Sequence, residues 1–168
     1  GLYGDNASIV LSSIAPLTGA RIYYTLDGTD PSSSSVLYTS PIVLHQATTL
    51  KARTYGADLH PSGILVANYV IDNAAPELSG LTFNGAAFPA VLTASGTIGI
   101  NATDTSGIRR VDFTLDGQSL ASDSIAADGF TVPFEIGNVI DGSHVLTAQA
   151  TDMTGLVYPV FSTDFVVA

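Results

Sequence analysis

Two aspartates in loops of nearly identical sequence are the residues best suited to chemistry. Asp104 lies in Thr-Asp-Thr-Ser-Gly and Asp152 in Thr-Asp-Met-Thr-Gly, and aspartate supplies thirteen of the fifteen acids. Calcium takes about six to eight oxygen ligands from carboxylates, carbonyls and water. Two loops at one end of a β-sandwich can share such a site, so Asp104 and Asp152 are candidate calcium ligands. The alternative is that each aspartate forms an Asx turn that caps its strand, and no loop has the EF-hand pattern.

Two other aspartates, Asp27 and Asp116, each precede a glycine. A glycosidase needs two carboxyl groups at a defined separation across a sugar site. The Asp-Gly dipeptide, however, is a strong hairpin signal, because both residues tolerate a positive φ in a tight turn. We therefore predict that both aspartates are turn residues rather than catalytic acids.

The histidines offer no clearer catalytic or metal site. His45, His60 and His144 lack a partner at a ligand spacing such as His-x₃-His. The letters Asp141, Ser143 and His144 can be written as a triad, but adjacent strand residues point to opposite faces. We expect no catalytic residue and no obligatory cofactor, with calcium as the one candidate ion.

Outward-facing aromatic residues are candidates for sugar binding. Tyr23 alternates with the expected core residues Ile22 and Tyr24, so it should point outward, and Tyr38 is a second candidate. Tyr55 and Phe88 are further aromatic residues expected at exposed positions. The alternative is that single exposed tyrosines are ordinary strand residues.

Composition excludes several partners. Net charge is −10, only 12% of residues are charged, and Lys51 is the single lysine. Phosphate backbones and anionic lipids are bound by clustered Lys and Arg, so the composition argues against nucleic acid and anionic lipid as partners, and we expect no insertion into a membrane. Mean hydropathy is +0.36, yet no apolar run approaches the ~20 residues that span a bilayer. The absence of cysteine excludes disulfides and thiolate sites.

Alternating apolar residues predict short strands separated by turns, with no helical periodicity. Related blocks occur twice, as in Tyr24–Gly28 and Phe113–Gly117, and a proline-ended linker spans 72–76. We therefore predict an all-β protein of two tandem Ig-like β-sandwiches, residues 1–73 and 74–168. The expected core consists of Ile22, Tyr24, Leu26, Leu50 and Ala52 in the first domain, and of Ile98, Ile100, Val111, Phe113, Leu115, Leu146 and Ala148 in the second.

The first domain resembles the small Ig-like module named after the C-terminal domain of chitobiase and β-hexosaminidase, also described as fibronectin type III-associated. The residues that carry the resemblance are Ala20–Pro31, Leu37–Ile42 and Thr48–Arg53. The second domain looks like a bacterial Ig-like domain, through Ala102–Ile108, Val111–Gly117 and Asp141–Asp152. Such modules imply extracellular or cell-surface proteins, where they act as spacers, adhesive units or companions of glycan-active enzymes.

The sequence thus favours a non-catalytic structural or adhesive module, either a spacer or an assembly unit of a surface protein or filament. The alternative is a carbohydrate-binding module of a secreted glycan-active enzyme. Strands such as Ile64–Val66 and Phe165–Val167 carry no charge, and charge is what usually guards an open sheet edge. We therefore expect these strands to be covered by neighbouring domains of a longer chain, or by copies of the protein in a fibre or surface layer.

Overall fold

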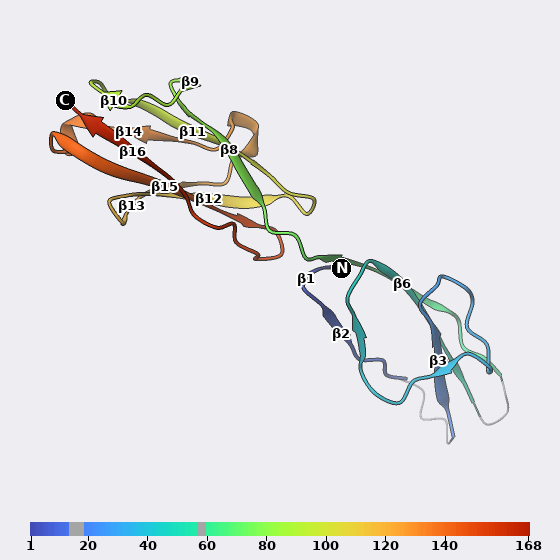
Figure 1. Ribbon diagram of the computed structural model, residues 1–168. Helices are drawn as coiled ribbons and strands as arrows, with labels where there is room; N and C mark the ends of the chain where they lie inside the picture. Colours follow the sequence, from blue (N-terminus) through green and yellow to red (C-terminus); the bar gives the residue numbers. More distant parts are fainter. Residues whose placement is uncertain (14–18, 57–59) are drawn as a thin grey trace. The chain divides into compact units, whose positions relative to one another are not determined.

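The computed structural model describes residues 1–13, 19–56 and 60–168. Within them, every regular element is a β-strand except for two single-turn 3₁₀ helices. The chain divides into two compact units, Gly1–Asn73 and Ala74–Ala168, and each is built from β-sheets (Figure 1). The prediction of an all-β chain of two Ig-like sandwiches is confirmed.

The first unit pairs a five-stranded sheet, in the order β1-β7-β6-β3-β4, with the two-stranded sheet β2-β5. All its strand pairs are antiparallel except β1 with β7. Its strands are β1 (Leu2–Gly4), β2 (Ala7–Ile9), β3 (Arg21–Thr25), β4 (Val36–Leu37), β5 (Ile42–Leu44), β6 (Thr48–Tyr55) and β7 (Leu65–Asp72).

Most of the core residues predicted for the first unit lie in its core. Leu50 and Ala52 of β6 are buried, and Ile22 and Tyr24 of β3 pack against them partly buried. Leu26 is a correction, because its side chain is 41% exposed. β3 ends at Thr25, so Leu26 belongs to the following loop and the strand alternation no longer applies to it.

The second unit packs the five-stranded sheet β10-β16-β15-β12-β13 with the four-stranded sheet β14-β11-β8-β9. Its elements are β8 (Glu77–Phe83), β9 (Ala86–Ala87), β10 (Val91–Leu92), β11 (Gly96–Thr103), β12 (Ile108–Leu115), β13 (Gln118–Asp123), η1 (Ala126–Asp128), β14 (Thr131–Phe134), η2 (Ile136–Asn138), β15 (Gly142–Asp152) and β16 (Phe161–Val167).

The core of the second unit follows the predicted register. Six of the seven predicted residues are buried, and Leu115 packs partly buried against them. Phe113 and Leu146, whose exposure would have revealed a register slip, are 0% and 1% exposed. The strands β12 and β15 therefore face the core as the alternation predicts.

The two Asp-Gly dipeptides form different turns. Asp116 (φ 49°) and Gly117 (φ 77°) join β12 to β13 as the two positive-φ residues of a tight hairpin, as predicted. Asp27 is a correction, because only Gly28 has a positive φ there, and β4 begins no earlier than Val36. Instead, Asp27 Oδ1 accepts hydrogen bonds from the Thr29 backbone N–H (3.0 Å) and hydroxyl (2.6 Å), which shape a longer loop.

One of the two uncharged strands is less open than the sequence suggests, because β16 lies between β10 and β15. In the other, β1 pairs only with Val70, Ile71 and Asp72 of β7, so Leu65 and Val66 are not covered by β1 and remain exposed. Of the outer strands, β1, β2, β4, β5, β9 and β10 contain only two or three residues each, whereas β14 has four and β13 has six. The short strands offer few open backbone groups to another chain, and β13 presents the longer edge.

Candidate cation site and tyrosine face

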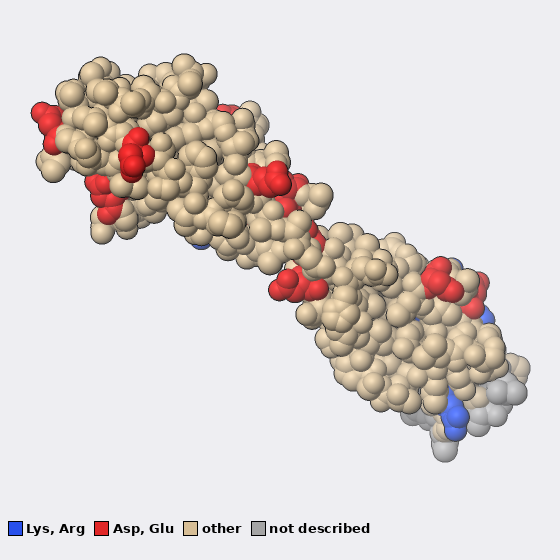
Figure 2. Space-filling model, in the orientation of Figure 1, with Lys and Arg blue, Asp and Glu red and all other residues tan. Residues whose placement is uncertain are grey.

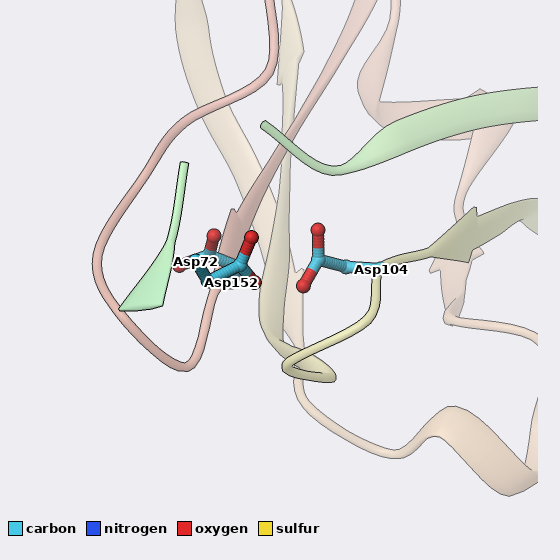
Figure 3. A group of neighbouring side chains, drawn as sticks. All are labelled: Asp72, Asp104 and Asp152. Carbon is cyan, nitrogen blue, oxygen red and sulfur yellow. The ribbon is translucent and has the colours of Figure 1, made fainter. Parts of the chain in front are cut away.

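The sheet of the second unit brings Asp104 and Asp152 together. Asp104 follows β11, Asp152 ends β15, and β12 pairs with β15 through Ile108 and Asp152. The N–H of Met153 donates to the carbonyl of Gly107 at 3.0 Å, which ties the two loops to each other. The carboxylates of Asp104 and Asp152 face each other, with one oxygen from each within 4.8 Å (Figure 3). Figure 3 also draws Asp72, the last residue of β7 in the first unit.

The two turns have the same local structure. Asp104 Oδ1 accepts hydrogen bonds from the backbone N–H and hydroxyl of Ser106, both at 2.7 Å. Asp152 Oδ1 likewise accepts from the N–H (2.7 Å) and hydroxyl (2.8 Å) of Thr154. It also accepts from the next two backbone N–H groups, at 2.7 and 2.9 Å. The Asx-turn interpretation therefore describes one oxygen of each carboxylate.

The second oxygen of Asp152 has a different environment. The Asp152 side chain is fully buried, and its Oδ2 has no hydrogen-bond partner. A buried acceptor without a donor costs about 1–3 kcal/mol, and more when it is charged. Asp104 Oδ2 takes no part in the turn hydrogen bonds either. Two oxygens, one from each turn, therefore remain available for a ligand.

The other predicted acids are less suited to catalysis. The hydrogen bonds from Thr29 lower the pKa of Asp27 below its ordinary value. The hydrogen bond from His144 and that from the Val145 N–H lower the pKa of Asp116. A glycosidase general acid requires a raised pKa, so neither aspartate has the property of that group.

Among the described residues, neither His144 nor the hollow in the first unit provides a Ser-His-Asp triad. His144 is buried and contacts Asp116 and the carbonyl of Ile140, whereas Ser143 on the opposite face is exposed. An open hollow of about 570 Å³ in the first unit has His60 and Arg53 in its lining, but its described lining contains no carboxylate.

The two candidate tyrosines lie on opposite faces of the first unit's sheet. Tyr38 packs against the core, and Tyr23 lies on the outer face with its ring at 5.7 Å and 85° from that of Tyr55. Arg53 is the cross-strand partner of Tyr23. We call Tyr23, Arg53 and Tyr55 the tyrosine face. Tyr55, a further candidate from the sequence, joins this face because it lies two residues after Arg53 in the same strand. Phe88 packs against the core of the second unit instead.

Comparisons with known proteins agree with this architecture. Residues 9–69 match the family model described as Fn3 associated, and residues 84–148 match the model of the bacterial Ig domain. The chain therefore contains Fn3- and Ig-like modules, a class that is commonly extracellular and whose members typically are accessory or structural rather than catalytic. Within the described ranges, no helix has the length and apolar character needed to cross a membrane.

One solved structure shares the fold over nearly the whole chain. It is that of the fibronectin(III)-like modules of CbhA from Clostridium thermocellum, with a TM-score of 0.53 and 22% identity. The similarity covers 99% of this chain and 88% of that one. No curated protein matches the chain.

Proposed function

We propose that the chain is a non-catalytic structural or adhesive module of an extracellular or cell-surface protein, where it acts as a spacer beside neighbouring domains. The match of each unit to an Fn3- or Ig-like family model supports this role. The narrower resemblance of the first unit to the chitobiase module is part of the same proposal.

The observation that carries the proposal is the surface of each unit. Few charges interrupt the face drawn in Figure 2, and several strand residues expose apolar side chains, among them Val43, Val66, Val70 and Val91. Because most of the outer strands contain only two or three residues, we infer that neighbouring domains cover this surface by contact between faces rather than by strand addition. This favours the spacer over the filament subunit.

Light scattering and a hydrolysis assay on the purified chain test the proposal. We expect a monomer at every concentration up to the millimolar range, because most of the outer strands are short. We also expect no release of sugar from chitin-type or other glycans. Association that grows with concentration would replace the spacer with an assembly unit. Turnover that survives repurification and disappears on mutation of a named acid would overturn the non-catalytic role.

The tyrosine face supports a second candidate, a carbohydrate-binding accessory module. Aromatic rings with a neighbouring guanidinium offer stacking surface and hydrogen-bond donors to a sugar. Tyr23, Tyr55 and Arg53 provide both on one face. Tyr38 is the matched control, because it packs on the opposite face against the core.

A glycan array that includes N-acetylglucosamine and glucose oligomers tests this candidate. If the face binds sugar, Tyr23→Ala abolishes the signal while Tyr38→Phe retains it. No signal from the unmodified chain, or a signal that Tyr23→Ala leaves unchanged, would reject the tyrosine face as a sugar site.

A further inference from the structure

We propose that the Asp104 and Asp152 turns of the second unit bind one Ca²⁺ ion. This site goes beyond the structural role above and does not depend on it. The first observation is Asp152 Oδ2, a fully buried carboxylate oxygen without a hydrogen-bond partner. Among the described residues, no Lys, Arg or His forms a salt bridge within 4.0 Å of either carboxylate. A buried charge of this kind requires a compensating partner, and a cation supplies one.

The spacing of the carboxylates suits calcium. Ca²⁺–oxygen distances are about 2.3–2.6 Å, so two oxygens on one ion lie at most ~5 Å apart. The limit of 4.8 Å between an Asp104 oxygen and an Asp152 oxygen falls within that range. The oxygens that the turns leave over, Oδ2 of each aspartate, are the ones we assign to the ion.

The turns hold these ligands in place before the ion arrives. Each Oδ1 is fixed by at least two hydrogen bonds within its own turn. Gly107 and Gly155, with φ values of 92° and 96°, close the two turns in the same left-handed conformation. A prearranged pair of carboxylates loses little conformational freedom on binding. The Asx turns are thus the support of the site rather than an alternative to it.

The surroundings supply further oxygens and a favourable field. A hollow of about 320 Å³ beside Asp104 is lined by Glu77, Thr103 and Thr105, among other residues of the second unit, and can admit water ligands. Residues 74–168 contain ten acids and two bases. This excess of negative charge raises the local concentration of divalent cations. Calcium tolerates such a mixed and irregular ligand set, whereas magnesium demands a near-ideal octahedron.

Calcium binding by the whole chain tests the proposal directly. After removal of metals with EDTA, we expect equilibrium dialysis with ⁴⁵Ca²⁺ to give one ion per chain. Extracellular calcium modules have dissociation constants on the order of 10⁻⁴–10⁻³ M, and we expect the same range here. In calorimetry, 1 mM free Ca²⁺ should raise one unfolding transition by roughly 2–10 °C. Mg²⁺ at equal concentration, with ionic strength matched by NaCl, should raise it less.

Two isosteric variants locate the site. Asp104→Asn and Asp152→Asn each keep a carbonyl oxygen for the turn hydrogen bonds but remove one ligand charge, so each should weaken binding at least ~10-fold. In EDTA, Asp152→Asn should be at least as stable as the parent, because its amide can donate toward Asp104. Asp164→Asn is the matched control, since Asp164 is exposed on β16, and it should bind calcium normally.

Three results would overturn the proposal. The first is an unmodified chain that neither binds ⁴⁵Ca²⁺ nor gains stability in millimolar Ca²⁺. The second is binding that both variants retain, which would place the ion elsewhere. The third is equal stabilisation by Mg²⁺, which would reject calcium as the ligand. If Asp152→Asn fails to fold, Asp104→Asn decides the outcome alone. Asp104 accepts fewer hydrogen bonds within its turn than Asp152 does, so its replacement should disturb the fold less.

Discussion

His144 is buried between two hydrogen-bond acceptors. Its Nδ1 lies 2.7 Å from Asp116 Oδ2, and its Nε2 lies 2.8 Å from the carbonyl oxygen of Ile140. Because a carboxylate and a carbonyl can only accept, the two hydrogen bonds form together only when both ring nitrogens carry a proton, which is the charged imidazolium. The hydrogen bond to Asp116 raises the pKa of His144 above 6.5, and that to Ile140 adds to the effect. The ring also packs 5.7 Å from that of Phe165, so the ion pair is anchored on the core.

This pair predicts a pH dependence of stability. The pKa of His144 is raised in the folded state, so its contribution is complete below its ordinary value of 6.5 and is lost as pH rises through the folded value. The pKa of Asp116 is lowered, so its contribution is complete above 3.8 and is lost as pH falls through the folded value. The pair therefore stabilises the second unit most between these two ordinary values, and we expect chemical denaturation to show a decline above neutrality.

Replacing the histidine tests that assignment. His144→Gln does not titrate in this range, so the decline of unfolding free energy above neutrality should flatten. His45→Gln is the matched control, because His45 is exposed, and it should leave the pH profile unchanged. A profile that is the same in His144→Gln and in the parent would show that other groups cause the dependence.

Short sequence patterns predict those features of an element that depend on neighbouring residues alone. Apolar alternation predicts which side of a strand is buried, and Val111, Phe113 and Leu146 are buried as predicted. Asp116-Gly117 closes a two-residue hairpin because strands of matching register flank it. Asp27-Gly28 has the same letters, but its side chain bonds to Thr29 and the chain continues as a loop. Dipeptide preference alone cannot distinguish these outcomes.

Other elements are set by partners distant in the sequence. β8 lacks a clear alternation, because Gly80 has a φ of 63° and the pairing with β11 shifts register between Gly99 and Asn101. A pattern search therefore misses this strand. The repeated Thr-Asp-x-(Ser/Thr)-Gly loops identify Asp104 and Asp152 from sequence. Their proximity, and the unpartnered Oδ2, depend on the pairing of β12 with β15, which a single sequence does not reveal.

At the scale of the whole chain, the two units differ in the size of their cores. Of the described residues, fourteen are buried in the hydrophobic cluster of the second unit and six in that of the first. Smaller domains bury a smaller share of their surface and are less stable. The hollow beside Ile22 and Leu65 further leaves part of the first unit's apolar face open. We therefore expect the first unit to unfold at a lower temperature than the second.

Tyrosine fluorescence separates the two transitions, because six of the seven tyrosines belong to residues 1–73 and tryptophan is absent. In EDTA, the tyrosine midpoint should lie below the main calorimetric transition. Ile42→Val and Ile98→Val delete the same methylene from buried sites in the first and second units. Each deletion costs about 0.5–1.5 kcal/mol, a shift of several degrees for a domain of this size. Ile42→Val should lower only the tyrosine midpoint and Ile98→Val only the later transition. If both variants instead lower a single common transition, the units unfold cooperatively, and core size does not set their order.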